Sequence, residues 1–266
     1  MDAGRGAQQA PAVSRADGEI VPEHFHLGAA ENRLLAALPG DVYARLEPHL
    51  EPISLALGSI IYEANDRLSY VYFPTTAIVS LVYTMENGGS AEMGVVGSDG
   101  IVGIAVFMGG DTTPNRAIVQ SAGDALRLEL RIFREEYKRV GELHRLLLLY
   151  TQVLLTQFSQ SAVCNQLHSV YQRLCRCLLL SHDRLSSNEL IMTQELISNI
   201  LGVRREGVSV AAHQLQESGL IRYNRGRITI VDRAGLESEV CECYRVVKSE
   251  CDRLLPYPPR PSNPAT

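Results

Sequence analysis

Long apolar runs are missing from this sequence. The longest of them, such as residues 146–149, are far shorter than the roughly 20 residues that a helix needs to cross a bilayer. The N-terminus also has no basic segment followed by an apolar stretch, so no secretory signal is recognised. We therefore expect a cytoplasmic protein that has no membrane partner.

A general excess of positive charge is missing too. The formal net charge of the 266 residues is −5, so the molecule as a whole is no binder of polyanions, and any contact with nucleic acid has to be local. Hydrophobic residues make up 45% and charged residues 21%, which is typical of globular proteins. The length leaves room for two ordinary domains, each with a core of its own.

Histidine is absent between Ile53 and Leu130. This absence argues against a metal-dependent enzyme built on a jelly-roll barrel, because such enzymes need clustered histidine and carboxylate ligands on their strands. We therefore expect no enzyme: neither a catalytic residue, nor a metal site, nor a cofactor.

C-x-x-C spacing is likewise absent among the six cysteines, which are Cys164, Cys175, Cys177, Cys241, Cys243 and Cys251. In a reducing compartment their even number does not imply disulfides. Two C-x-C pairs, Cys175/Cys177 and Cys241/Cys243, fall on predicted helices, where residues i and i+2 face about 200° apart and chelate a metal poorly. We interpret the thiols as structural, and a redox or metal role for the two pairs stays open as the alternative.

The most informative stretch is residues 193–219, which predicts two short helices joined by a tight turn. Apolar residues repeat at helical spacing at Leu196, Ile200 and Leu201 and again at Val208, Ala211, Ala212 and Leu215. Thr193 is placed to cap the first helix, Gly202 lies in the turn, and Gly219 ends the second helix in the left-handed conformation. This arrangement is typical of a helix-turn-helix unit, although such hairpins also occur as plain packing units.

The residues around this hairpin favour DNA binding. Arg204, Arg205 and Glu206 open the second helix, where a recognition helix points at base edges. Residues 220–223 and 227–231 predict two strands around an Asn-Arg-Gly turn, a wing from which Arg225 and Arg227 would reach phosphates. Between Arg204 and Arg233 six arginines stand against three acidic residues. Positive charge is therefore concentrated where phosphates would lie.

The rest of the chain predicts an α+β protein with its parts in a fixed order. Residues 1–29 indicate a flexible tail, and residues 30–140 contain short β-rich runs at the spacing of a jelly-roll barrel. A long central helix follows at residues 141–168, then the winged helix-turn-helix at residues 169–233. The last segment, residues 234–266, predicts a final helix and a loose tail. The helix is expected to run without a break from residue 233 to residue 255.

The central helix carries residues at alternating spacings of four and three, which is the pattern of a coiled-coil seam. We expect this seam to join two copies of the chain; a single long core helix is the alternative. The seam residues are Leu143, Leu147, Tyr150, Leu154, Gln157 and Ser161.

The order of parts resembles the Crp/Fnr family of bacterial transcription regulators. The resemblance runs from about Glu31 to Val231, and its sharpest motifs are Thr193-Gln194-Glu195, Leu201-Gly202-Val203, Arg205-Glu206 and Gly219-Leu220-Ile221. It implies that Arg205 and Glu206 read base edges, guanine and cytosine respectively. Val210 stands where many members have a further arginine, and Arg204 where serine is usual. We therefore expect a different operator, with Arg204, Ser209 and His213 sharing the recognition, and Thr193 and Gln194 completing the DNA-binding set.

The barrel departs further from the family pattern. The resemblance implies a cassette in which a glutamate holds the ribose hydroxyl and an arginine the cyclic phosphate. Arg116 matches the arginine, but Ile104 occupies the place of the glutamate and leaves the hydroxyl unpaired, which costs roughly 1–3 kcal/mol. Glu92, Gly103 and Arg116 are the candidate effector pocket for an unidentified ligand. The iron–sulfur sensor of other members is excluded because no cysteine precedes Cys164.

These features predict a homodimeric, sequence-specific transcription regulator on a pseudo-palindromic operator. Its two recognition helices would enter successive major grooves of double-stranded DNA. The resemblance also implies RNA polymerase as a partner. The alternative is a regulator whose DNA binding requires a cyclic nucleotide or another small molecule.

Overall fold

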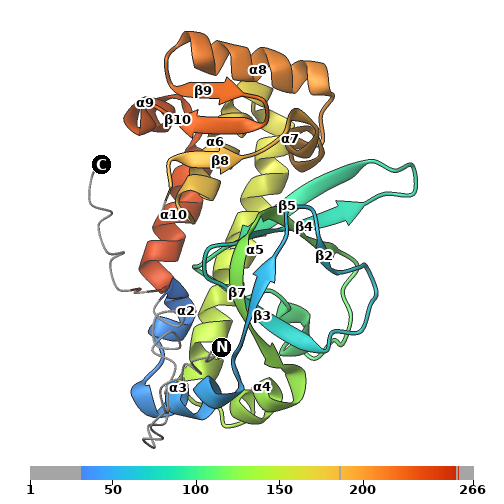
Figure 1. Ribbon diagram of the computed structural model, residues 1–266, viewed down its shortest axis with the longest axis vertical. Helices are drawn as coiled ribbons and strands as arrows, with labels where there is room; N and C mark the ends of the chain where they lie inside the picture. Colours follow the sequence, from blue (N-terminus) through green and yellow to red (C-terminus); the bar gives the residue numbers. More distant parts are fainter. Residues whose placement is uncertain (1–30, 186, 256, 258–266) are drawn as a thin grey trace, which may run out of the picture.

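The architecture is taken from a computed structural model, which describes residues 31–185, 187–255 and 257 (Figure 1). The tail expected at residues 1–29 and the end of the chain from residue 258 lie outside the described residues. Within them no helix has both the length and the apolar character that crossing a membrane requires.

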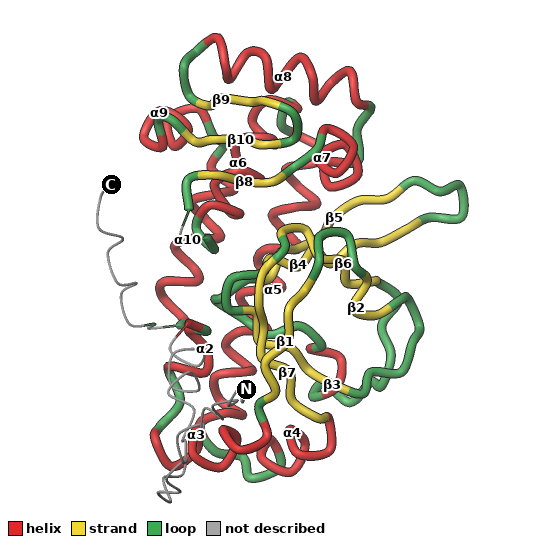
Figure 2. The backbone as a smooth tube through the Cα atoms, in the orientation of Figure 1, coloured by secondary structure: helices red, strands yellow, loops and turns green. Residues whose placement is uncertain are grey.

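Short strands with alternating apolar residues form the barrel that the sequence predicts. They are β1 (Glu51–Leu55), β2 (Ile60–Tyr62), β3 (Tyr70–Pro74), β4 (Ile78–Thr84), β5 (Ser90–Val96), β6 (Arg116–Ser121) and β7 (Gly123–Glu129). They pair antiparallel in two sheets of order β1-β7-β3 and β2-β6-β4-β5. Val71, Phe73, Val79 and Leu128 are fully buried in the core between the sheets. Figure 2 shows how β4 and β5 continue outward as a hairpin.

Four short helical segments flank the barrel strands along the chain: α2 (Arg33–Ala36), α3 (Gly40–Leu46) and the 3-10 helix η1 (Glu47–His49) precede β1, and α4 (Leu130–Tyr137) follows β7. Asn32 caps α2 by accepting a hydrogen bond from the Leu35 N–H. Its buried amide donates to the carbonyl oxygens of Pro74 at 2.8 Å and Gly100 at 3.0 Å. Since every polar atom of this buried side chain is paired, Asn32 fastens the first helix to the barrel.

Helix α5 (Glu142–Leu167) runs along the molecule and joins the barrel to the C-terminal part (Figure 1). The residues expected to form a dimer seam are all buried in the core of their own chain: Leu143, Leu147, Tyr150, Leu154, Gln157 and Ser161. Gln157, for example, accepts a hydrogen bond from the Val95 N–H of β5 at 2.9 Å. The predicted seam is therefore wrong, because the barrel takes that face of the helix.

A different face of α5 remains exposed. Leu148 and Leu155 keep 53% and 56% of their surface accessible, and Ala162 follows seven residues later. Between them lie the exposed polar residues Gln152, Ser159 and Gln166. Positions 148, 152, 155, 159, 162 and 166 again alternate by four and three, so the helix carries two such stripes and only this one is free of the barrel.

The C-terminal part begins with α6 (Val170–His182), whose first turn is closed by a capping box between Ser169 and Gln172. Next come β8 (Glu189–Ile191), α7 (Gln194–Leu201), α8 (Arg205–Glu217), β9 (Ile221–Asn224), β10 (Arg227–Ile230) and α9 (Arg233–Glu239). The strands form a sheet of order β8-β10-β9, in which β8 has no counterpart in the sequence prediction. Ile78 and Val95 of the barrel belong to the same hydrophobic cluster as the helices, so the two parts pack on each other.

The last helix differs from the prediction. One helix was expected from residue 233 to 255, but the structure has two, α9 and α10 (Glu242–Leu254), with a break at Val240 and Cys241. Cys241 has extended backbone angles, φ −67° and ψ 162°, and precedes the first turn of α10. The expectation that both C-x-C pairs lie on helices therefore holds for Cys175/Cys177 and is wrong for Cys241/Cys243.

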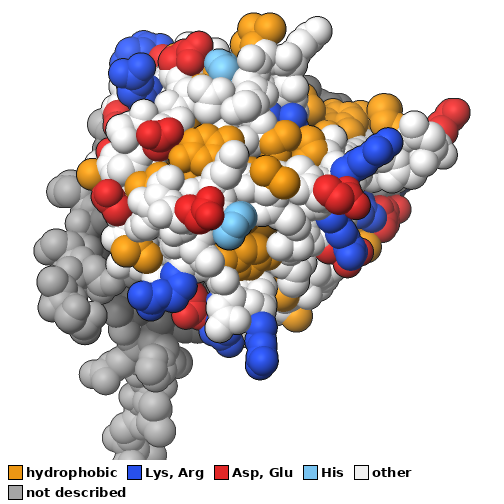
Figure 3. All heavy atoms as spheres, turned by 90° about the horizontal axis from the view of Figure 1, so that it is seen from above, with side chains coloured by type: hydrophobic (Ala, Val, Ile, Leu, Met, Phe, Trp, Pro, Cys, Tyr) orange, Lys and Arg blue, Asp and Glu red, His pale blue; other side chains and the backbone are white. Residues whose placement is uncertain are grey.

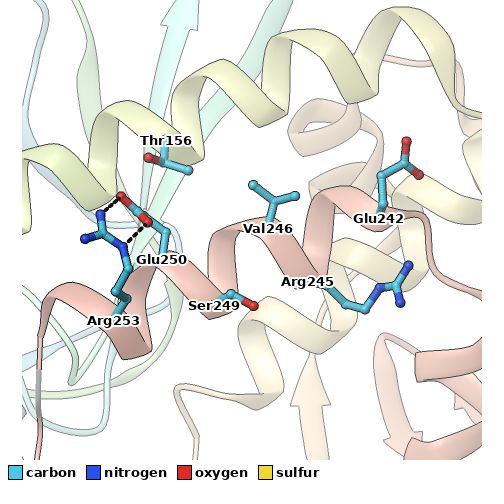
Figure 4. A pocket seen from close by; sticks show the side chains of 7 residues that line it. All are labelled: Thr156, Glu242, Arg245, Val246, Ser249, Glu250 and Arg253. Atoms are coloured by element: carbon cyan, nitrogen blue, oxygen red, sulfur yellow. Dashed lines mark hydrogen bonds and ion pairs between the residues drawn. The ribbon is translucent and has the colours of Figure 1, made fainter.

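Helix α10 lies alongside α5, and Gln152 donates a hydrogen bond to Glu250 across the contact. A shallow groove of about 650 Å³ opens between the two helices (Figure 4). Its lining residues include Thr156 and Ser249, and Arg253 pairs with Glu250 along its edge. The groove is open to solvent, and all of its lining residues except Thr156 come from α10.

Candidate nucleic-acid interface

The turn between α7 and α8 has the geometry that its residues predict. The Thr193 hydroxyl accepts a hydrogen bond from the Leu196 N–H and caps α7. Gly202 lies at φ 61° and ψ 39°, in the left-handed region that glycine adopts without strain. Gly219 at φ 72° ends the second helix in the same way. These positions set α8 across the top of the molecule (Figure 1).

Helix α8 presents its N-terminus and one side to solvent. Val208, Ala211, Ala212 and Leu215 are buried, whereas Arg204, Arg205, Glu206, Val210 and His213 are exposed. Arg204 is the N-cap residue and makes no side-chain cap, so the first N–H groups of α8 stay available to an anion. Ser209 is half-buried and donates a hydrogen bond to Gln194 at 3.1 Å, which ties α8 to the start of α7.

Several of the predicted DNA-contacting side chains have partners within the chain. Arg205 forms an ion pair with Glu195 at 2.5 Å, and His213 lies 3.3 Å from Glu217. Arg227 pairs with Glu189 of the unpredicted strand β8. All of these side chains are more than 40% exposed, so exchanging an acidic partner for a phosphate or a base costs little.

The wing is a tight hairpin. Arg225 and Gly226 both have positive φ, 47° and 80°, which are the signs of a type I′ turn, and Asn224 faces Arg227 across it. The Met192 N–H bonds to the Gly226 carbonyl at 2.8 Å, so the tip is held beside the start of α7. Arg225 is exposed at this tip and forms no ion pair with any described residue.

The structure differs from the sequence prediction at two arginines, Arg233 and Arg222. Arg233 belongs to the basic stretch in the sequence, but its half-buried guanidinium donates to the Asp183 carboxylate at 2.6 Å and to the Tyr244 hydroxyl at 2.9 Å. Arg233 therefore stabilises the fold and is not part of the candidate DNA-binding surface. Arg222 is a further exposed arginine, on β9 beside the buried Ile221, and the alternation of apolar and polar residues along this strand is the sequence signal for it. Viewed onto α8, basic, acidic and apolar side chains are interspersed (Figure 3).

The three residues expected to form one effector pocket do not line the same cavity. A cavity of about 150 Å³ in the barrel is lined by Gly103 but by neither Glu92 nor Arg116. Glu92 instead accepts a hydrogen bond from Ser80, and burial raises its pKa to about 7. Arg116 faces Glu63, with 3.9 Å between Nη1 and the carboxylate. Glu92 and Arg116 both pair in register with Val82, from the two strands that flank β4, but neither lines the cavity that Gly103 borders, so the three residues do not form one pocket there.

The cavity itself is small and apolar in character. Ile104 lines it where the resemblance expects a glutamate, together with Leu81, Ile101 and Phe158, the last from α5. Ligand pockets have volumes of about 300–1,000 Å³, so this cavity is below the range for a nucleotide-sized ligand. Since Phe158 belongs to α5, a small occupant would touch the barrel and the long helix at once.

The fold and this surface define a class: a winged helix-turn-helix protein with a sensor-like barrel joined to it by a long helix. Comparison with family models agrees in both parts. The model of the cyclic nucleotide-binding domain matches residues 52–140, and that of the Crp-like helix-turn-helix domain matches residues 172–239. The chain belongs to the Crp/Fnr family of transcription regulators.

Solved structures share this architecture at low sequence identity. FixK2 from Bradyrhizobium japonicum has a TM-score of 0.62 and 18% identity, over 72% of this chain and 98% of that one. TTHB099, a regulator of the CRP family from Thermus thermophilus, has a TM-score of 0.58 and 21% identity, over 70% and 95%. A putative transcriptional regulator of the crp/fnr family from Eubacterium rectale has a TM-score of 0.57 and 20% identity, over 77% of this chain and 96% of that one. The comparison with curated proteins yields no match.

Proposed function

We propose that this chain is a homodimeric transcription regulator that binds a pseudo-palindromic operator in the cytoplasm without a bound cyclic nucleotide. The observation that carries the proposal is that the exposed N-terminus of α8, with Arg204, Arg205 and Glu206, and the wing tip with the exposed Arg225 are both joined to the region where α7 begins, through the Arg205–Glu195 ion pair and the Met192–Gly226 hydrogen bond. A helix end, two arginines and a basic wing on one surface provide contacts to both base edges and phosphates.

The contacts divide by chemistry. Arg205 is assigned to guanine and Glu206 to the cytosine amino group, since these pairs match donors to acceptors in the major groove. Arg225, Arg227 and the open N–H groups of α8 are assigned to phosphates. Ser209 and His213 are four residues apart on one side of α8, and Arg204 stands at its N-cap; we assign all three to a share of the recognition. Thr193 and Gln194 lie at the start of α7. RNA polymerase is the further partner that the family resemblance implies.

The dimer is assigned to the exposed stripe of α5 at positions 148, 152, 155, 159, 162 and 166. Its spacing suits a parallel pair of helices, and Leu148 and Leu155 supply apolar contacts that are otherwise left in water. Such a seam places the two α8 helices on the same end of the assembly. Two recognition helices would then lie on one face of DNA, about 34–36 Å apart.

The barrel favours a regulator that does not depend on a cyclic nucleotide. Ile104 removes the ribose contact, and the cavity of about 150 Å³ is below the size of a nucleotide site. The ligand-dependent alternative is supported by one observation, the contribution of Phe158 of α5 to the cavity wall. An occupant of that cavity would shift α5 only if it bound its two positions with different affinity.

Selection of bound DNA from a random pool by the purified protein tests the proposal. We expect an inverted repeat whose half-sites are one helical turn apart, enriched in the same way with and without added cyclic nucleotide. Calorimetric titration with cyclic nucleotides should give no heat. Enrichment that needs a cyclic nucleotide would establish the alternative, and a pool without any enriched sequence would overturn both.

A further inference from the structure

Three thiols and an imidazole from distant parts of the chain meet where α5 ends. Cys164 lies in the last turn of α5 and His168 is its C-cap, whereas Cys241 is the N-cap of α10 and Cys243 lies in its first turn. One ligand atom from each of the four residues can be chosen so that all lie within 4.8 Å of one another. Two of the six separations are 3.6 Å: Cys164 Sγ to Cys241 Sγ, and Cys243 Sγ to His168 Nδ1.

These separations fit the edges of a zinc-sized tetrahedron. Zn–S bonds of about 2.3 Å and a Zn–N bond of about 2.0–2.1 Å, at the tetrahedral angle, place two sulfurs ~3.8 Å apart and a sulfur and a nitrogen ~3.6 Å apart. Both measured separations are within about 0.2 Å of these values. The other four separations are at most 4.8 Å.

The local backbone explains why four separated residues converge. Cys164 and His168 are four residues apart, so they project from the same side of α5 at its end. Cys241 is extended and lies outside the helix, so the rule that residues i and i+2 of a helix face apart does not apply to the Cys241/Cys243 pair. Within a helix this C-x-C pair would chelate a metal poorly. Because the backbone is extended at Cys241, both thiols can face the same point at the start of α10.

The surroundings are those of a closed site. Cys164, Cys241 and Cys243 are at most 3% exposed, and the His168 side chain is 15% exposed. The ring nitrogen of His168 that faces away from the thiols, Nε2, lies 3.5 Å from a Glu242 carboxylate oxygen. The second ring nitrogen of a metal-bound histidine usually donates to a carboxylate, a backbone carbonyl or a water, which fixes the ring and its tautomer, and Glu242 is placed to serve as that carboxylate.

Charge is balanced nearby as well. Three thiolates and one Zn²⁺ carry a net charge of −1, which a buried site has to offset. The buried Arg176 donates from Nη1 to Ser161, which lies one turn before Cys164 on α5. Its Nε has no hydrogen-bond partner among the described residues. A permanent cation with spare donors therefore stands one turn from the thiols.

We propose that Cys164, His168, Cys241 and Cys243 bind one zinc ion in a structural site that fastens α10 to the end of the central helix. Three sulfurs and one nitrogen in a tetrahedron are a donor set typical of zinc, and four protein ligands leave no open position for catalysis. His168 is also the link between α5 and α6. The ion thus joins the end of the long helix, the start of the DNA-binding part and the last helix.

Metal content of the full-length protein, purified with a thiol reductant and without chelator, tests this directly. We expect one zinc per chain by elemental analysis. After exchange, Co²⁺ should show the intense visible bands of tetrahedral coordination and a thiolate-to-cobalt absorption. These readouts use the unmodified chain and do not depend on DNA binding, so they stand or fall separately from the proposed function.

Matched variants locate the ion. Cys243→Ser and His168→Asn should lose the zinc or the tetrahedral cobalt spectrum, whereas Cys251→Ser, on the same helix α10 but outside the cluster, should keep both. Glu242→Gln keeps all four ligands and should weaken zinc about 10–100-fold. Circular dichroism shows whether each variant is folded. If a variant is unfolded, the spectrum of the cobalt-loaded wild type still shows whether the metal is held by thiolates in tetrahedral coordination.

Three results would overturn the proposal. One is a reduced, folded protein that contains no zinc and binds Co²⁺ only with the weak spectrum of octahedral coordination. Another is undiminished zinc in Cys243→Ser. The third is a metal-free protein whose mass is lower by two hydrogens, with Cys164 and Cys241 joined by a disulfide.

Discussion

The two halves of the molecule differ in how closely their structures match the site residues expected from the family resemblance. In the C-terminal half, the residues expected at the interface come together: Thr193 and Gly202 shape the turn, and Arg204, Arg205 and Glu206 are exposed at the start of α8. In the barrel, neither Glu92 nor Arg116 lines the cavity that Gly103 borders. A short hairpin sets its own geometry through local rules, whereas a pocket between strands depends on registers and bulges set over many residues.

The long helix between the halves offers the sharpest test, because one of its stripes faces the barrel and the other faces solvent. Leu155→Glu places a charge in the exposed stripe, and in a two-fold dimer it faces the same charge on the partner. We expect the dimer dissociation constant to rise at least about 100-fold, which is ~3 kcal/mol, as like charges brought together cost several kcal/mol. Sedimentation equilibrium measures the change.

Leu57→Glu is the matched control for that variant, since Leu57 is also an exposed leucine, 44% accessible, but lies in the barrel. It should leave the dimer intact. If Leu155→Glu is as dimeric as Leu57→Glu, the stripe assigned here is not the seam.

The second test, in the barrel, concerns the effect of the Glu92 carboxylate on the stability of the fold. Burial is the main cause that raises its pKa from 4.5 to about 7, against the hydrogen bond from Ser80. The folded state therefore holds a proton that the unfolded chain releases, and the free energy of unfolding falls as the pH rises from about 4.5 to about 7. Glu92→Gln cannot ionise, so above pH 7 it should be more stable than the wild type by up to about 3 kcal/mol.

Urea unfolding at pH 4 and pH 8 measures that difference, which should vanish at the lower pH. Glu86→Gln, in the exposed turn between β4 and β5, serves as the control and should show no pH-dependent gain. Equal stability of Glu92→Gln and wild type at pH 8 would show that the partly buried Glu92 carboxylate does not destabilise the fold.

Arg205 and Arg225 compare base recognition with phosphate contact inside the DNA-binding half. Arg205→Ala should cost about 1–3 kcal/mol on the selected operator and relax the preference at one base pair. Competition binding against operators with single substitutions measures this. Discrimination that stays intact at every base pair would remove Arg205 from base recognition.

Arg225→Ala is expected to have the smallest effect. Losing one phosphate contact should weaken binding to all sequences alike and lower the slope of log K against log salt by about 0.9. Titrations at several salt concentrations, on the operator and on unrelated DNA, measure both quantities. A loss confined to one sequence would assign base recognition to the wing instead.

The sequence alone was enough to predict the order of parts, the capped helices of the winged helix-turn-helix and the exposed arginines of α8, because these depend on residues within a few turns of one another. Which face of α5 meets the barrel, which arginine is structural, and where Glu92 and Arg116 point were decided only by tertiary packing. So was the meeting of Cys164 and His168 with Cys241 and Cys243, more than 70 positions along the chain. Spacing alone does not distinguish the two stripes, because both alternate by four and three, and the sheet that covers one of them separates core from surface.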